Sequence, residues 1–221
     1  MGSITRGLSN NITTGGVILP AGITNSSVSA VTSFANASGG TLVLLSTQTA
    51  NASATISFTT GLDSTYDEYI FKFINIHPSE QAVFHMNFST DGGSNYNVTK
   101  TSTFFASFHD EADTTATLSY RTDYDLAQST SFQPLMEDML NPTGENDVSG
   151  SGTLTLFNPA STTYVKHYIS TCHNMRQGTF AFSNYSAGYA NTTSAINAIR
   201  FKMSSGNIDD GIIKLYGIKK S

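Results

Sequence analysis

Charged residues, cysteine and tryptophan are scarce or missing in this chain of 221 residues. Asp, Glu, Lys and Arg make up 12% of it, about half their share in an average globular domain, Trp is absent and Cys172 is the single cysteine. One cysteine cannot form an internal disulfide bond, so we expect a fold that is stabilised by packing and made in a reducing compartment.

The charge balance and the lack of long apolar runs exclude two classes of partner. The net charge is −5 and the basic residues cluster only at Lys219–Lys220, whereas a protein that binds nucleic acid presents a basic face to the phosphates. No run reaches the roughly 18 apolar residues of a membrane span, and the first residues lack the basic and apolar regions of a secretory signal. We therefore expect no nucleic-acid partner and no membrane partner.

Ser, Thr, Asn and Gly dominate the chain instead, and these residues favour strands and turns over long helices. A helix bundle, a coiled coil and a doubly wound α/β fold are therefore disfavoured. Short runs with alternating polarity recur every 8 to 15 residues and predict an antiparallel β-sandwich, jelly-roll-like, over residues 41–221. The strands we expect are Thr41–Gln48, Ala54–Thr60, Tyr69–Ile76, Ala82–Ser89, Asn97–Phe108, Gly152–Asn158, Tyr164–His173, Thr179–Tyr185, Ala198–Met203 and Ile212–Lys219.

Three segments between these strands call for other local structure. Pro134–Leu140 predicts a short helix with Pro134 in its first turn, inside a long connection from Asp110 to Gly150. A connection of that length in a compact β domain is typical of a binding or interface loop. Ser186–Gly188, between Tyr185 and Tyr189, and Asp209–Gly211 are predicted to be turns.

The first 40 residues differ from the rest because they carry one charge, Arg6, and no charged residue occurs from Gly7 to Leu62. Their scattered aliphatic residues show no sustained period, so this segment cannot build a core of its own. We expect an extended arm over 1–40 that lies on a neighbouring subunit and donates backbone hydrogen bonds and small apolar side chains, although a free polar leader has the same composition. The expected docking residues are Ile4, Arg6, Leu8, Ile12, Val17, Ile18, Leu19 and Ile23.

Two motifs have the composition of local sites. Ser89–Tyr96 resembles the Asp-box, with Tyr96 in place of Trp, and predicts a tight turn in which Asp91 accepts amide hydrogen bonds and Gly92 and Gly93 adopt positive φ. His109–Asp113 concentrates oxygen and nitrogen ligands, but it lacks the spacing of a calcium loop, so a solvated acidic loop is the preferred interpretation.

No pattern of an enzyme active site is present. The histidines lack zinc spacing, the adjacent Cys172 and His173 should point to opposite faces of one strand, and G-x-S-x-G, P-loop and G-x-G-x-x-G motifs are missing. The sequence therefore predicts a protein that is not an enzyme, with no cofactor and no metal.

Aromatic side chains near the expected loops raise a different function. Tyr120 and Tyr124 follow the strand that ends at Phe108, and Tyr189 follows the predicted turn at Ser186–Gly188. Loop aromatics can stack on sugar rings, although packing within the loops is the preferred explanation. These three tyrosines are the candidate contacts for a glycan.

Three phrases, Ser3–Gly22, Phe88–Asn97 and Ile199–Lys220, give the chain a resemblance to small virion structural proteins of marine tailed bacteriophages. The resemblance implies a β-sandwich presented on a particle. We expect a virion protein made in the bacterial cytoplasm, a capsid decoration or cement protein or a short head or tail appendage, in a homo-oligomer or symmetric array with other virion proteins. The alternative is a receptor- or glycan-binding module of a tail fibre that meets host surface sugars.

Overall fold

The computed structural model describes residues 41–139, 148–176 and 180–219, which belong to the compact unit Gly40–Ser221. Within these ranges the chain forms twelve strands and no helix, so the all-β prediction is confirmed. The strands are β1 (Leu42–Ser53), β2 (Ile56–Phe58), β3 (Glu68–Pro78), β4 (Ala82–Ser89), β5 (Lys100–Asp110), β6 (Ala116–Tyr120), β7 (Gln133–Met139), β8 (Gly150–Phe157), β9 (Lys166–Arg176), β10 (Phe180–Ala190), β11 (Ala198–Met203) and β12 (Ile208–Ile218).

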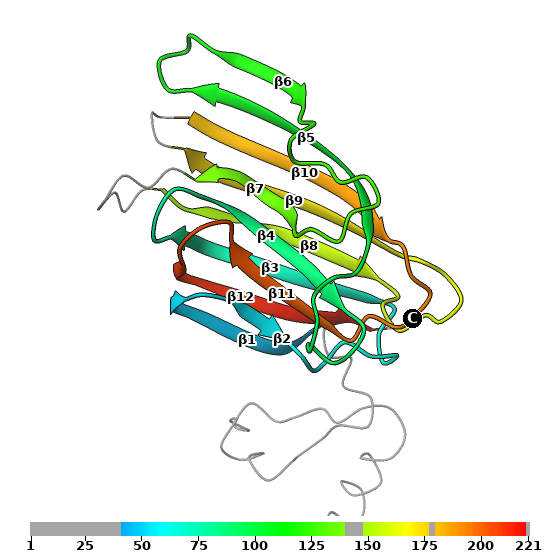
Figure 1. The fold of residues 1–221 in the computed structure, drawn as a ribbon. Helices are drawn as coiled ribbons and strands as arrows, with labels where there is room; N and C mark the ends of the chain where they lie inside the picture. The colour runs from blue at the N-terminus through cyan, green and yellow to red at the C-terminus, as the bar shows by residue number, and fades with distance from the viewer. Residues whose placement is uncertain (1–40, 140–147, 177–179, 220–221) are drawn as a thin grey trace, which may run out of the picture. The chain divides into compact units, whose positions relative to one another are not determined.

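The strands form two antiparallel sheets of unequal width. The larger sheet has eight strands in the order β1-β12-β3-β8-β9-β10-β5-β6, and the smaller has four in the order β2-β11-β4-β7. Figure 1 shows the small sheet in front of one part of the large sheet, while β5 and β6 extend beyond it. At its β7 edge the small sheet contacts β9 and β10.

A core of aromatic rings joins the two sheets. Along β3, alternate side chains turn inward, as the sequence predicts, and bury Phe71 and Phe73. Both rings contact Phe201 of β11, with ring centroids 5.4 and 5.2 Å apart, and Phe73 also meets Phe84 of β4 at 5.2 Å. Edge-on packing of this kind adds to the free energy of burial, so this cluster helps to hold the two sheets together.

A second, smaller cluster lies at the other end of the large sheet. It consists of Phe104 and Ala106 of β5 and Phe182 of β10, with Tyr124 packed on Phe104 at 5.4 Å. Tyr124 belongs to the connection between β6 and β7, which runs beside β5 and hydrogen-bonds to its backbone at Lys100, Ser102 and Phe104. This connection takes the place of the small sheet over β5.

The predicted helix at Pro134–Leu140 is wrong, because Gln133–Met139 is strand β7. β7 pairs antiparallel with β4 through an irregular register, and Asp138 adopts a positive φ of 36°. The close spacing of Leu135, Met136 and Met139 is compatible with a helix face. Pairing with β4, about 50 residues earlier in the chain, decides the strand instead.

Both predicted turns within the last third of the chain are also wrong. Ser186–Gly188 lies inside β10, where a Cβ at Gly188 would come within 2.5 Å of the Thr101 carbonyl oxygen. Asp209–Gly211 lies inside β12, where the register shifts and Gly211 has a φ of 128°. In each case glycine marks a close approach or a bulge within a strand, and not the end of one.

The Asp-box-like segment after β4 forms a tight turn. The Asp91 carboxylate accepts hydrogen bonds from the Asn95 backbone N–H at 2.9 Å and from the Ser89 hydroxyl at 2.7 Å. Gly92 and Gly93 have φ values of 73° and 91°. These hydrogen bonds lower the pKa of Asp91 to about 2, so the carboxylate is ionised at neutral pH and serves the turn.

Candidate interaction face

Within the described residues, no second sheet packs on one side of the large sheet. Along β8, β9, β10 and β5, buried side chains alternate with exposed or half-exposed ones that point away from the small sheet, and β6, which has no buried residue, continues this side through its pairing with β5. We call these outward side chains the outer face. They are Ser151, Thr153, Thr155, Phe157, His167, Ile169, Thr171, His173, Met175, Ala181, Ser183, Tyr185, Ala187, Tyr189, Thr101, Thr103, Phe105, Ser107, His109, Ala116, Leu118 and Tyr120.

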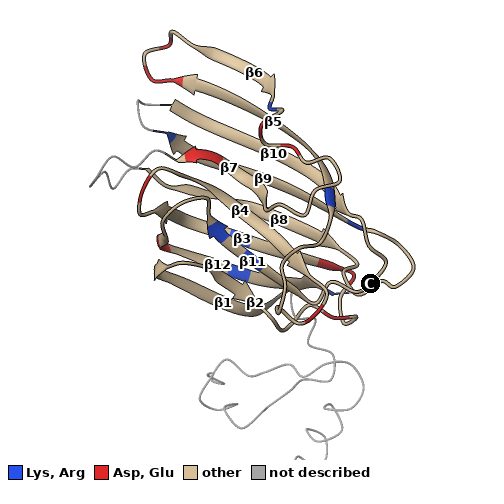
Figure 2. Cartoon of the chain, in the orientation of Figure 1, with Lys and Arg blue, Asp and Glu red and all other residues tan. Residues whose placement is uncertain are grey.

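The outer face carries no Asp, Glu, Lys or Arg. The charged residues of the five strands, Lys100, Asp110, Lys166 and Arg176, all occupy inward positions. Figure 2 shows the same strands mostly in tan, with charge gathered at strand ends and on the β3, β11 and β12 side. Surface sheets normally place charge outward and apolar side chains inward, so this arrangement is unusual.

Exposed apolar side chains gather on the outer side of the large sheet. Among the described residues, the large hydrophobic side chains with the greatest exposure are Leu42, Leu44, Ile74, Phe105, Leu118, Tyr120, Tyr164 and Ile169. All except Tyr164 lie on that side, as their strand registers show. Exposed apolar side chains that gather in this way, unlike scattered ones, indicate an interaction site.

A row of three aromatic residues crosses the outer face. Tyr185 of β10 pairs with Phe105 of β5, and Phe105 pairs with Tyr120 of β6. The rings of Tyr185 and Phe105 stack almost parallel, with centroids 4.9 Å apart and an interplanar angle of 9°. The Tyr120 hydroxyl donates a 2.6 Å hydrogen bond to Asp125, which fixes the ring beside the other two.

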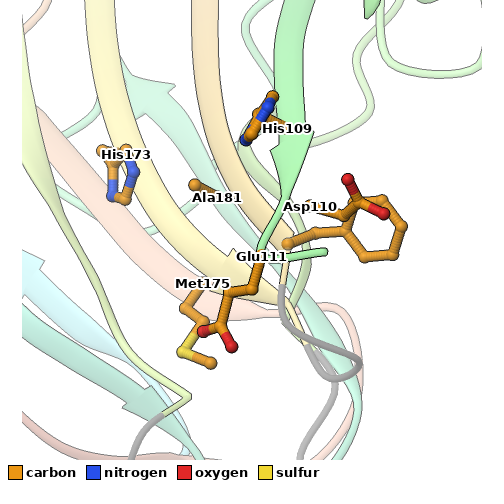
Figure 3. A pocket seen from close by; sticks show the side chains of 7 residues that line it. His109, Asp110, Glu111, His173, Met175 and Ala181 are labelled. Carbon is orange, nitrogen blue, oxygen red and sulfur yellow. The ribbon is translucent and has the colours of Figure 1, made fainter. Parts of the chain in front are cut away.

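A pocket of about 240 Å³ lies at the end of the outer face where β5, β9 and β10 meet. Met175, Ala181 and Phe180 form much of its apolar wall. Figure 3 shows the rings of His109 and His173 on either side of Ala181. His109 is within 3.1 Å of Asp113, and within the described ranges no three His, Cys, Asp or Glu side chains are placed to hold a metal ion.

The inward side of the same strands carries a buried polar cluster. The Arg121 guanidinium donates a 2.5 Å hydrogen bond to Glu137 Oε2, and the Glu137 side chain is almost completely buried. Burial raises the pKa of Glu137, while Arg121 opposes that change. Asn184 and Asn174 link this region to β10 and β9, because Asn184 Nδ2 donates to Asn174 Oδ1 at 2.6 Å and Asn184 Oδ1 accepts from the Glu137 N–H at 3.3 Å.

A buried lysine lies at the start of β5. The Lys100 Nζ donates hydrogen bonds to Asn87 Oδ1 at 2.5 Å and to the Val98 carbonyl at 2.7 Å. Burial lowers the pKa of Lys100 to about 7, so a neutral amine and an ammonium coexist at neutral pH. Asn87 belongs to β4, and this contact therefore ties the small sheet to the large one.

The candidate residues from the sequence fall in different places. Tyr120 and Tyr189 lie on the outer face, but Tyr189 is opposite Thr101, four positions along β5 from the partner of Tyr120. Tyr124 lies on the inward side against Phe104. The structure thus does not bring the three tyrosines into one site. The docking residues expected between Ile4 and Ile23 lie outside the described residues.

Sequence reasoning missed the outer face as a unit. The period-two pattern of each strand separates Phe105 from Phe104 and Ile169 from Tyr168, and that signal was available. It cannot show that the same outward positions of five strands adjoin, because the order β8-β9-β10-β5-β6 depends on pairing between distant segments.

Comparisons of the chain with protein-family models and with curated proteins, and of its structure with solved structures, found no match. No helix long and apolar enough to cross a bilayer occurs in the part of the chain that the structure describes. The functional argument therefore rests on the residues themselves.

Proposed function

We propose that this chain is a structural protein of a bacteriophage particle that binds neighbouring protein subunits through the outer face. The observation that carries the proposal is the outer face itself, which lacks charge and exposes Phe105, Leu118, Tyr120 and Ile169. The centres of protein interfaces are depleted in charge and enriched in aromatic residues. The resemblance of the three quoted phrases to virion proteins supports the particle as the setting.

In this proposal the two packed sheets form a jelly-roll-like sandwich, and residues 1–40 form an arm that docks on a neighbouring subunit. The protein decorates or cements the capsid or forms a short head or tail appendage, after synthesis in the host cytoplasm. Repetition on a symmetric particle multiplies weak contacts into tight attachment, so each face needs only modest affinity.

A receptor- or glycan-binding module of a tail fibre is the second candidate function. The exposed Tyr120, and Tyr189 with its neighbour Gln128 (Nε2 to the Tyr189 hydroxyl, 3.4 Å), favour it, because aromatic and amide groups together suit sugars. However, Phe105 and Tyr185 turn their ring faces toward one another, whereas a sugar stacks on an open ring face. This geometry favours a protein partner over a glycan.

An electron-microscopy reconstruction of the intact particle tests the proposal. We expect the chain in multiple symmetric copies, with its outer face against another protein subunit. A particle that holds no copy of the chain, or copies whose outer face points to solvent, would contradict the proposal. A few copies at the tail with a sugar on the outer face would establish the second candidate instead.

Two variants provide the matched comparison. Ile169→Glu places a charge on the outer face, and Tyr164→Glu places one at an exposed apolar residue outside it. We expect Ile169→Glu to reduce incorporation into particles about 100-fold, because a buried unpaired carboxylate opposes the contact, and Tyr164→Glu to leave it unchanged. The measurement is the ratio of this chain to other particle proteins in purified particles.

A further inference from the structure

We propose that the outer face binds the outer face of a second copy of this chain, related to the first by a two-fold axis that runs along β10. The inference rests on the proposed function, in which the outer face contacts protein, and it names the partner. It depends on three features of the described residues: the size of the face, its lack of charge and the order of large and small side chains along it.

The outer face is large enough for a stable dimer. The strands β8, β9, β10, β5 and β6 hold 8, 11, 11, 11 and 5 residues, so at a rise of about 3.3 Å per residue and a spacing of about 4.8 Å the face covers about 700 Å². A standard protein interface buries about 800 Å² on each partner. One further copy of the same face therefore supplies most of the area that such an interface needs.

Charge favours self-association through this face. The chain has a net charge of −5, so two copies repel one another wherever their charged surfaces approach. Two identical outer faces oppose no Asp, Glu, Lys or Arg of their own strands, because the outward positions contain none, and Glu111 lines the pocket just beyond the end of β5. The outer side of β3 and β12, with Lys72 and Lys214, would place like charges opposite each other if it packed on itself in the same way.

The order of side chains along the face makes it complementary to itself. The registers align one row across the five strands: Thr153, Thr171, Tyr185, Phe105 and Tyr120. A two-fold axis along β10 reverses this row over its own copy. Tyr120 then lies over Thr153 and Phe105 over Thr171, while Tyr185 meets the partner copy's Tyr185. On either side of the axis, large side chains thus face small ones, as close packing of two sheets requires.

The neighbouring rows obey the same rule. The next row runs Ser151, His173, Ser183, Ser107, Leu118, and its reversal places Leu118 over Ser151. The row on the other side places Ile169 of β9 over Thr103 of β5. The two most exposed aliphatic residues of the outer face, Leu118 and Ile169, therefore each meet a small polar residue of the second copy.

Sedimentation of the full chain across a range of concentrations tests the association. We expect a monomer–dimer equilibrium that Ile169→Glu weakens about 100-fold or more, since each dimer would bury two carboxylates. Leu118→Glu, on a different strand, should do the same, and Tyr164→Glu should leave the equilibrium unchanged. A wild-type chain that stays monomeric at high concentration overturns the proposal, as does a dimer that neither outer-face variant weakens. Circular dichroism of each variant shows whether it is folded.

A thiol cross-linking experiment tests the axis. Ser183→Cys places a thiol on the outward side of β10, next to the proposed axis, and Ser205→Cys places one in an exposed turn away from the face. The native Cys172 is buried and does not compete. We expect a short bifunctional thiol reagent to link two copies of Ser183→Cys and not of Ser205→Cys. Equal cross-linking of the two, or none of Ser183→Cys in a dimer, overturns this axis.

Failure of this inference and failure of the proposed function give different results. If the wild-type chain is monomeric in solution and enters particles, while the Ile169→Glu variant does not enter them, the proposed function holds and the inference fails. The outer face then binds a different protein. If the wild-type chain forms a dimer that Ile169→Glu dissociates, but no particle contains the chain, the inferred dimer interface holds and the proposed function fails.

Discussion

The two ends of the large sheet are covered on their inward side in different ways, and the difference separates stability from interaction. At the β3 end the small sheet lies over it, and Phe71, Phe73, Phe84 and Phe201 form one continuous aromatic core. At the β5 end a loop lies over it, with a small cluster around Phe104 and a layer of buried polar groups. We infer that the β3 end supplies most of the stability, and that the β5 end is a platform that holds the outer face.

The largest expected effect comes from truncating a ring in each cluster. Phe201→Ala removes a ring that contacts four other phenylalanines, and we expect it to lower the free energy of unfolding by about 4 kcal/mol. Phe182→Ala, in the smaller cluster beside the half-buried Phe108, should cost about 2 kcal/mol because the site can collapse or hydrate. Urea unfolding measures both, and equal losses would contradict the comparison.

The next effect concerns the ion pair at the β5 end. Arg121→Met leaves the Glu137 carboxylate buried without its partner, and we expect a loss of about 3 kcal/mol at pH 8. Because the folded-state pKa of Glu137 is already raised, protonation favours the folded chain, and the loss should shrink as the pH falls toward 4. Adding Glu137→Gln should restore most of the stability at pH 8. A loss independent of pH would show that Arg121 acts through packing alone.

The smallest of the three effects is a pH dependence at the junction of the sheets. The Lys100 pKa is about 7 in the folded chain and near 10.5 when unfolded, so the unfolded chain binds more protons between these values. Stability should therefore rise with pH, by about 2 kcal/mol between pH 7 and pH 9. Lys100→Met should remove this rise, whereas a change at the exposed Lys219 should keep it. Denaturant unfolding at each pH measures the two curves.

Local patterns were sufficient for most of the fold and insufficient for the site. The alternation in Tyr69–Ile76 and Ala82–Ser89 located β3 and β4 to within two residues, because each strand has one buried and one solvent-facing side. The helix prediction over Pro134–Leu140 failed because six of the seven residues of β7 (Gln133–Met139) are buried, and no period distinguishes the two faces of such a strand. The turn predictions at Gly188 and Gly211 failed because close contacts from neighbouring strands, and not a turn, require glycine at these positions.

The outer face could not be found from the sequence for a related reason. Phe105, Tyr185 and Tyr120 are separated by up to 80 residues in the chain and become neighbours only through the order of β10, β5 and β6. The absence of charged residues at the outward positions is the one feature of the outer face that the sequence of each strand shows by itself. Reading that absence as a shared surface requires the sheet order.

The burial of Cys172 gives this protein its own reporter of motion. The thiol lies inward on β9 beside Ser170, is 1% exposed, and burial raises its pKa to about 12. A thiol reagent can reach it only while the sheets are apart, so the rate of labelling counts how often the native chain opens. The labelling rate of Cys172 can thus be measured, without any introduced probe, for the free chain and for the assembled chain. The decrease in this rate on assembly measures how strongly the neighbouring subunits suppress opening of the fold.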